Sequence, residues 1–323
     1  MKTWNETRAV LEVARSALAA GQPCALALLT HVKGSSFRRP GAKLLIRADG
    51  SMTGNVSGGC LENDLRERAL RAMQSGQPES VHYQTGSDED TIWGLGLGCD
   101  GELDLLVRPI APSATWPADV LRRMETHEAF ALDWPADGEP RLADFATDPV
   151  PGAFRDHLEP PPDLVIVGAG DDAIPLVELA IETGFRVTVT DHRPGYLPPH
   201  RFPRAVSIKQ LRPDAPADAL PHDARTLVVI KNHALEMDKQ WAARFARTDV
   251  AYIGLLGPHA RCDKIRAHMG DARMERVFGP VGLDLGAEGA EQIAVSIVAQ
   301  LLSVWRQRDA VPLSQRAGSI HRR

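Results

Sequence analysis

Apolar residues recur along the first third of the chain with two different spacings. Recurrence at every third or fourth residue is typical of amphipathic helices, and runs of consecutive or alternating apolar residues are typical of strands. These spacings predict two helices and two strands, at residues 6–19 and 61–73 and at residues 24–29 and 102–107. We therefore expect an N-terminal domain of mixed helices and strands over residues 1–110.

From residue 163 onward, short strand-like runs alternate with helical segments. The predicted strands cover residues 163–167, 186–190, 226–230 and 250–253. Such alternation is typical of a doubly wound parallel sheet. The expected fold class is therefore α/β, with an N-terminal α+β domain followed by a C-terminal Rossmann-like domain with a doubly wound parallel sheet over residues 163–305.

The segment between these two domains has a different composition. Residues 111–162 contain many prolines and have weak periodicity. We interpret the segment as a linker that carries one helix near residues 119–126 and a strand at residues 130–134. The last residues, 306–323, are expected to form a flexible tail.

Composition restricts the classes of function. The 323-residue chain has 43% hydrophobic residues, 24% charged residues and a net charge of −5. These values favour a soluble globular protein and give no basic bias toward nucleic acid. No apolar run is long enough to span a bilayer, and the first residues lack a signal-peptide pattern. We therefore expect a cytoplasmic protein that binds neither nucleic acid nor membranes.

Cysteine usage points to thiol chemistry. The four cysteines stand at positions 24, 60, 99 and 262, with no CxxC pair. This scatter argues against a structural zinc site and against a disulfide framework. Any chemistry that the cysteines carry is therefore expected to come from free thiols.

A glycine-rich turn, Gly-Asn-Val-Ser-Gly-Gly-Cys at residues 54–60, ends in Cys60 directly before the second predicted helix. Backbone N–H groups and the positive end of the helix dipole stabilise a thiolate there, which favours binding of an anion, a soft metal or a sulfur electrophile. A second glycine-rich run, at residues 94–99, ends in Cys99 and leads into a predicted strand. The alternative for Cys60 is a small buried cysteine in a tight turn.

The segment from residue 30 to residue 43 is rich in cations and hydroxyl groups. The side chains of this kind are Lys33, Ser35, Ser36, Arg38, Arg39 and Lys43. Guanidinium groups bind phosphate through paired hydrogen bonds, and serine hydroxyls add donors, so the segment suits an anionic ligand. A solvated basic loop between two strands is the alternative.

The C-terminal domain opens with a dinucleotide-binding pattern. Its first strand is followed by Gly168, Gly170 and a helix, and the next strand ends at Asp191, 21 residues after Gly170. The glycines allow a pyrophosphate to approach the helix N-terminus, and the acid can reach a ribose hydroxyl. The loop between Gly254 and Gly257 lies at the carboxyl end of a later strand, where such sheets bind ligands.

Ordered motifs in both halves of the chain resemble the XdhC/CoxI family of molybdenum-enzyme accessory proteins. They include Gly-Ser-Ser-Phe-Arg-Arg-Pro-Gly-Ala-Lys at residues 34–43 and Val-Thr-Val-Thr-Asp-His-Arg-Pro at residues 187–194. The other matching runs lie at residues 54–62, 96–99, 167–170, 252–257, 279–286 and 292–297. The chain departs from the family pattern at Phe37, Asp171, Lys231, Asn232 and Pro258.

The resemblance implies a chaperone for the molybdenum cofactor, a molybdopterin that also exists as a cytosine dinucleotide. Such a protein binds the cofactor, holds it while a cysteine desulfurase supplies a sulfido ligand, and delivers it to a xanthine dehydrogenase-type molybdenum hydroxylase. We expect it to form a homodimer. The basic segment would contact the pterin phosphate, and Cys60 and Cys99 would offer thiolate to molybdenum or relay sulfur.

The resemblance also implies a nucleotide at the C-terminal domain, where His233 retains a family imidazole. The alternative for His233 is a side chain that caps or packs a loop. The candidate cofactor-binding residues are Ser35, Ser36, Arg38, Arg39, Lys43, Ser57, Gly58, Gly59, Cys60, Cys99, Gly168, Gly170, Asp191, His233, Gly254 and Gly257. Cys60 is the candidate metal ligand, and no catalytic residue is assigned.

Two classes of function compete. The first is a binding and delivery protein with no turnover of its own. The second is an NAD(P)-dependent oxidoreductase built on the C-terminal domain, which needs an acid–base residue facing the nicotinamide. No Tyr-x-x-x-Lys pair occurs in residues 163–305. We therefore expect a non-catalytic cofactor chaperone, with the oxidoreductase as the alternative.

Overall fold

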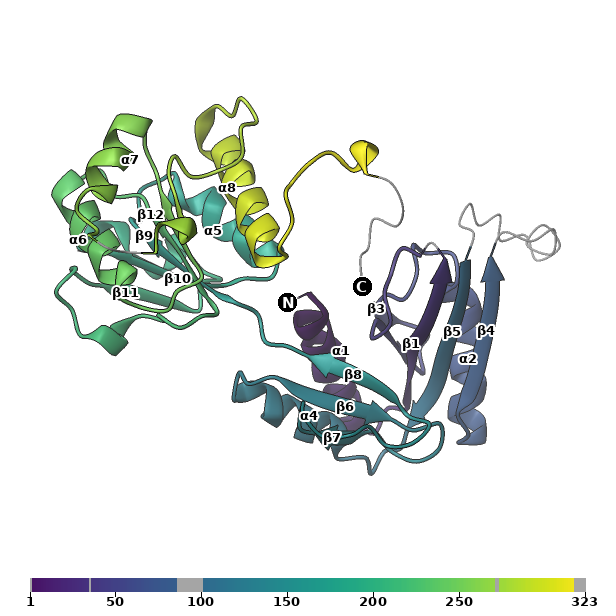
Figure 1. Cartoon of the computed structure of the whole chain (residues 1–323). Coiled ribbons are helices and arrows are strands. Elements are labelled where there is room, and N and C mark those ends of the chain that lie inside the picture. The colour runs from purple at the N-terminus through teal and green to yellow at the C-terminus, as the bar shows by residue number, and fades with distance from the viewer. Residues whose placement is uncertain (1, 35, 86–100, 271–272, 317–323) are drawn as a thin grey trace. The chain divides into compact units, whose positions relative to one another are not determined.

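The structure is a computed structural model that describes residues 2–34, 36–85, 101–270 and 273–316. The chain divides into two compact units, Met1–Pro160 and Pro161–Arg323 (Figure 1). The boundary falls within the run of three prolines that begins at Pro160.

A five-stranded antiparallel sheet forms the centre of the first unit, with the strand order β3-β2-β1-β5-β4. Its helices and strands are α1 (Lys2–Ala19), β1 (Cys24–Gly34), β2 (Lys43–Arg47), β3 (Met52–Gly54), α2 (Glu62–Ser75), β4 (Glu79–Thr85) and β5 (Gly101–Ile110). β1 opens with six consecutive buried residues because both faces of the sheet are covered. It also continues beyond the predicted strand end at residue 29.

The two faces of this sheet bury different side chains. Leu65 and Ala69 of α2 pack against Leu29, Leu44 and neighbouring residues on one face. On the other face, α1 packs together with Leu26, Leu28 and Leu45. The fourfold spacing that predicted a helix after Cys60 is therefore confirmed as the buried face of α2.

Residues 116–158 belong to the first unit and are not a linker. They form α4 (Trp116–Glu125) and a three-stranded antiparallel sheet with the order β7-β6-β8, made of β6 (Phe130–Trp134), β7 (Arg141–Ala143) and β8 (Phe154–Leu158). The ring of Phe130 packs on Trp4 of α1, with centroids 5.6 Å apart, and Trp116 packs on Trp134 at 5.4 Å. The helix and the strand predicted within the segment are confirmed as α4 and β6, but their buried side chains pack in the core of the first unit instead of connecting two domains.

The second unit contains a six-stranded parallel sheet with the order β11-β10-β9-β12-β13-β14. Its strands are β9 (Asp163–Val167), β10 (Arg186–Asp191), β11 (Ser207–Gln210), β12 (Thr226–Ile230), β13 (Tyr252–Leu255) and β14 (Val277–Phe278). Its α-helices are α5 (Ala173–Glu182), α6 (Leu235–Ala246), α7 (His259–Arg266) and α8 (Gly289–Trp305), and α5 packs on α8 while α6 packs on α7. Numbered along the chain, the strands follow the order 3-2-1-4-5-6. This order confirms the prediction of a Rossmann-like doubly wound parallel sheet.

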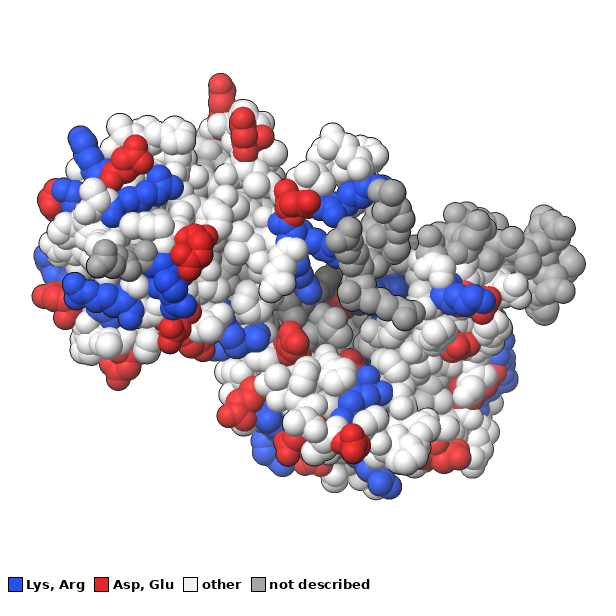
Figure 2. All heavy atoms as spheres, viewed as in Figure 1, with Lys and Arg blue, Asp and Glu red and all other residues white. Residues whose placement is uncertain are grey.

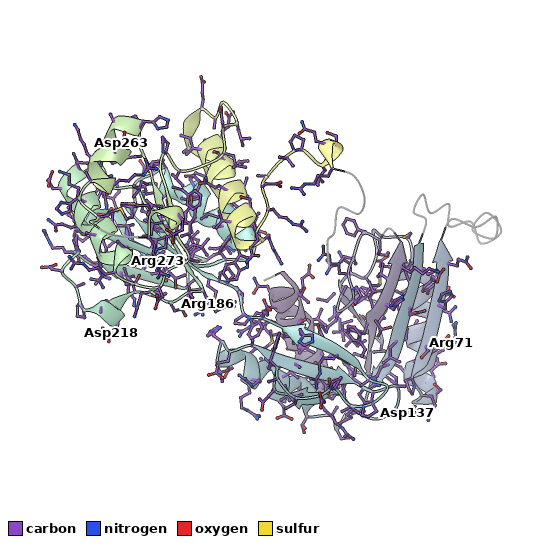
Figure 3. The ribbon with its side chains drawn as sticks, viewed as in Figure 1. Arg71, Asp137, Arg186, Asp218, Asp263 and Arg273 are labelled. Atoms are coloured by element: carbon purple, nitrogen blue, oxygen red, sulfur yellow. The ribbon has the colours of Figure 1, made fainter. Side chains whose placement is uncertain are left out.

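Short 3-10 helices lie at Pro194–Tyr196, Pro199–Arg201, Ala217–Ala219, Met274–Arg276 and Leu313–Gln315. Among the described residues, no helix is both long enough and apolar enough to cross a bilayer. Acidic and basic side chains are interspersed over the visible surface of each unit (Figure 2). Figure 3 shows the side chains as sticks, and its labelled residues Arg71, Asp137 and Asp263 are exposed.

Candidate functional site

Strand register brings several predicted site segments to one end of the five-stranded sheet. Gly34, the last residue of β1, pairs with Gly101 at the start of β5, and Gly101 also pairs with Thr85 at the end of β4. Leu44 near the start of β2 pairs with Gly54, the last residue of β3. The connections that leave β1 and β3 therefore meet at the same end of the sheet (Figure 1). Cys99 and Ser35 lie outside the described residues.

Cys60 is exposed at this end of the sheet. It stands two residues before α2, whose N-cap residue is Leu61. The turn that presents it is closed by Ser57 and Glu62: the Ser57 hydroxyl donates to Glu62 Oε2 at 2.5 Å, and Ser57 Oγ accepts from the N–H of Gly59 at 3.2 Å. The alternative of a buried structural cysteine is therefore excluded for Cys60. The part that Glu62 plays in closing this turn was not predicted from the sequence.

The outer surface of the turn is open. Gly59 has a φ of +110°, a conformation that favours glycine, and a Cβ at Gly58 or Gly59 would meet no atom within 4 Å. Gly54 is glycine for the opposite reason, because a Cβ there would lie 2.4 Å from the Lys43 carbonyl oxygen. The start of the turn, at Gly54, therefore packs closely against β2. Its end, at Gly58, Gly59 and Cys60, leaves backbone groups and a thiol accessible.

Most cations of the basic segment have internal partners. Lys33 lies 2.6 Å from Glu102, and Arg38 forms a forked ion pair with Glu6 of α1. Arg39 is exposed, and no acidic side chain in the described residues lies within ion-pair distance of it. The sequence predicted either an anion-binding segment or a solvated basic loop. Neither prediction describes the segment fully, because Glu6 of α1 and Glu102 of β5 neutralise part of its charge.

Lys43 has a structural role rather than a ligand-binding one. Its ammonium is buried and donates to Thr7 Oγ1 at 3.0 Å, to the Gly41 carbonyl at 2.9 Å and to Asp156 Oδ2 at 2.5 Å. All three donor positions of the ammonium are therefore used inside the protein. Its prediction as a cofactor-binding residue is corrected, while Ser36 accepts a hydrogen bond from the Arg38 N–H at 3.3 Å and stays a candidate.

A second candidate site lies at the carboxyl ends of β9 and β12, where the strand order of the parallel sheet reverses. The cavity there measures 280 Å³ and is lined by Gly170, Asp171, Asp172, Arg193, Tyr196 and His233. Gly168 has a φ of +112°, and a Cβ would lie 2.8 Å from the Lys231 carbonyl oxygen, so the turn after β9 requires glycine. His233 is exposed beside this turn, whereas Gly254 and Gly257 do not line the cavity.

Asp191 is fully engaged by internal donors. Its carboxylate accepts hydrogen bonds from the N–H of Ala169 at 2.9 Å and from the N–H and guanidinium of Arg193 at 2.8–3.0 Å. Burial works against its ionisation, but these hydrogen bonds outweigh burial and lower the pKa of Asp191 to about 2. The predicted contact with a ribose hydroxyl is therefore not available in this arrangement. The Asp-x-Arg spacing is the sequence signal that points to Arg193.

The acidic side chains of the turn after β9 are neutralised as well. Asp171 lies 2.9 Å from Arg201, and Asp172 lies 2.6 Å from Lys231. Burial lowers the pKa of Lys231, and the Asp172 carboxylate opposes this shift. The cavity is therefore lined by paired charges rather than by a surplus of either sign.

Metal binding by the protein alone has no support in the residues that the structure describes. None of their His, Cys, Asp and Glu side chains form a group of three or more that could hold a metal ion.

Comparisons with known proteins cover both units. A family model described as the XdhC Rossmann domain matches residues 164–301, and a model described as the XdhC and CoxI family matches residues 17–84. The chain is 31% identical over 319 residues to a probable xanthine dehydrogenase subunit of Bacillus subtilis, covering 88% of this chain and 94% of that protein. It is 28% identical over 311 residues to the molybdenum cofactor insertion chaperone PaoD of Escherichia coli, covering 93% and 89% of the two chains.

A solved structure has a similar fold. The crystal structure of a protein described as a xanthine dehydrogenase from Bacillus halodurans matches with a TM-score of 0.82 and 30% sequence identity. The match covers 95% of this chain and 99% of that chain.

Proposed function

The chain belongs to the XdhC and CoxI family, and on this premise we propose that it binds the molybdenum cofactor and inserts it into a xanthine dehydrogenase-type molybdenum hydroxylase. The observation that carries this proposal is the exposed Cys60 thiol on an open glycine turn, at the same end of the sheet as the basic segment. A soft sulfur ligand at the same end of the sheet as the exposed Arg39 suits a ligand that contains both a metal and a phosphate.

Each residue of the proposed site has a distinct part. Cys60 would coordinate molybdenum or relay sulfur, and the backbone of Gly58 and Gly59 would allow the cofactor to approach closely. Arg39 and Ser36 would bind the pterin phosphate. The cofactor is the cargo, and it supplies the redox-active metal to the recipient enzyme. The residues of this chain bind it, orient it and shield it from solvent.

The family relationship suggests the partners. A cysteine desulfurase would supply the sulfido ligand while the cofactor is held at Cys60, and two copies of the chain would associate as a homodimer in the cytoplasm. The cofactor would be bound either as molybdopterin or in its cytosine dinucleotide form. A nucleotide held by the second unit would occupy its cavity, against Tyr196 and His233.

An NAD(P)-dependent oxidoreductase ranks second. The doubly wound sheet with its glycine turn favours it, but the Asp191 carboxylate that would hold the ribose is already paired with Arg193. Residues 163–305 also contain no Tyr-x-x-x-Lys pair, which would exchange protons with a substrate.

Parallel titrations of the purified full-length protein separate the two functions. One titrant is isolated molybdenum cofactor, and the other is NADH together with small carbonyl substrates. The proposal predicts stoichiometric retention of the cofactor and no oxidation of NADH. Tight binding of NADH with substrate reduction, and no retention of the cofactor, would contradict it.

A further inference from the structure

The Rossmann unit carries an arginine at the position where such sheets bind ribose. Asp191 ends β10, the second strand of the sheet, and an acid there accepts hydrogen bonds from ribose hydroxyls in dinucleotide-binding proteins. Arg193 follows two residues later. Its Nε lies 3.0 Å from Asp191 Oδ1, and its Nη2 lies 2.8 Å from Asp191 Oδ2. Two parallel N–H donors therefore face the two oxygens of one carboxylate.

The remaining acceptor capacity of Asp191 is also used. A carboxylate offers about four lone-pair positions. The backbone N–H groups of Ala169 and Arg193 each donate to it at 2.9 Å, in addition to the two guanidinium bonds. The side chain of Asp191 has an exposed fraction of 0%. The adjacent hydroxyls of a ribose would thus find no free acceptor on Asp191.

A contact with an aromatic ring also holds Arg193 in this position. Its guanidinium carbon lies 4.1 Å from the centroid of the Tyr196 ring, a cation–π contact, and both residues line the 280 Å³ cavity. The guanidinium therefore pairs with Asp191 and lines the cavity at the same time, whereas Asp191 is not among the residues that line the cavity.

We propose that Arg193 occupies the ribose subsite of this Rossmann unit, so that a nucleotide with a ribose diol binds only by displacing the guanidinium from Asp191. Binding of such a nucleotide then includes the cost of breaking a forked ion pair. The affinity for NAD-type dinucleotides and other ribonucleotides is lower than the fold alone would give. This inference goes beyond cofactor binding at Cys60 and does not depend on it.

Isothermal titration of the full-length protein with three nucleotides tests the inference. NADH and cytidine monophosphate carry the diol, and 2′,3′-dideoxycytidine monophosphate lacks it. Arg193→Lys keeps the positive charge but cannot donate through a rigid fork. The affinity for NADH and cytidine monophosphate should rise about tenfold or more in Arg193→Lys, as expected when hydrogen bonds to a charged group become available. The affinity for the dideoxy nucleotide should not change.

A matched control and a second variant keep the result interpretable. Arg204→Lys alters another arginine of this unit, which pairs with Glu178 and Glu182 at the surface, and should leave all three affinities unchanged. The ammonium introduced by Arg193→Lys can still pair with Asp191. Arg193→Gln removes the charge altogether, so it should raise the affinity for NADH and cytidine monophosphate even when Arg193→Lys does not. Thermal unfolding of each variant confirms that the second unit is folded.

Several outcomes would overturn the inference. An equal gain for the dideoxy nucleotide would mean that the diol is not involved, and a loss of affinity in both Arg193 variants would make Arg193 a ligand contact. If none of the three nucleotides binds to any variant, breaking the Arg193–Asp191 ion pair opens no ribose subsite. Retention of the molybdenum cofactor is measured separately in the same proteins, so these results leave the proposal for Cys60 untouched.

Discussion

Lys43 Nζ lies 2.5 Å from Asp156 Oδ2, and this buried ion pair joins β2 of the five-stranded sheet to β8 of the three-stranded sheet. Removing one partner would leave the other charge buried without compensation. Asp156→Ala should therefore lower the free energy of unfolding of the first unit by about 3–5 kcal/mol. Urea denaturation followed by circular dichroism measures the loss.

The exposed pair of Lys33 and Glu102 is the control for this prediction. Because water screens that pair, Glu102→Ala should lower the free energy of unfolding far less than Asp156→Ala does. The double variant Lys43→Met/Asp156→Leu should recover much of the loss, since no charge remains buried. Equal, small losses for both single variants would contradict a stabilising role for the buried pair.

Asp191 should make the second unit sensitive to acid. Burial opposes its ionisation, but hydrogen bonds from Arg193 and from backbone N–H groups lower its folded pKa to about 2, below the value of about 3.9 of an unfolded chain. Its stabilising effect is therefore fully present above about pH 4 and is lost as the pH falls toward 2. Asp191→Asn should cost roughly 2 kcal/mol at pH 7 and flatten the loss of stability between pH 4 and pH 2.

Denaturation at a series of pH values measures this effect. Asp218→Asn changes an exposed aspartate of the same unit (Figure 3) and should leave the acid dependence as in the wild type. A variant at Asp191 that retained the full acid dependence would show that other groups are responsible.

The described cysteines should differ sharply in reactivity. Cys60 is exposed, whereas Cys24 and Cys262 are buried. Burial raises the pKa of Cys24 to about 11 and also raises the pKa of Cys262. Because the thiolate is the nucleophile, iodoacetamide at neutral pH should modify Cys60 first and the two buried thiols only after unfolding. Peptide mass mapping over time measures the order, and early labelling of Cys24 would be inconsistent with the structure.

The turn after β9 should not tolerate a side chain at Gly168. Its φ is +112°, and a Cβ would lie 2.8 Å from the carbonyl oxygen of Lys231. Gly168→Ala should therefore lower the free energy of unfolding of the second unit by more than about 1 kcal/mol. Gly195→Ala is the matched control, because a Cβ there meets no atom within 4 Å. Similar melting temperatures for the two variants would argue against the strain.

The regular parts of the fold could be predicted from the sequence because each element carries its own periodicity. The strands β9 and β12 are short, largely apolar runs, and α2 has an apolar residue at every fourth position. The helix and strand of the segment with α4 and β6 were also predicted, but the packing of the segment on the first unit was not, because it depends on contacts with distant elements such as that of Phe130 with Trp4. Local periodicity predicts the elements but does not show which distant elements they pack against.

The candidate site could be predicted only in part for a related reason. The glycine turn and Cys60 are contiguous in sequence, so their place at a helix start followed from local residues. The partners of charged side chains lie far along the chain: Lys43 pairs with Asp156, and Arg38 pairs with Glu6. A basic segment therefore looked more available to a ligand than it is.

Retention of the molybdenum cofactor by the full-length protein tests most directly whether Cys60 holds it, which is the central claim. Wild type and the variants Cys60→Ala, Cys24→Ala and Cys262→Ala are incubated with isolated cofactor and desalted, and bound molybdenum and pterin are quantified per chain. We expect stoichiometric retention by the wild type and by the Cys24 and Cys262 variants, and loss of retention by the folded Cys60 variant. Undiminished retention by Cys60→Ala would contradict the claim.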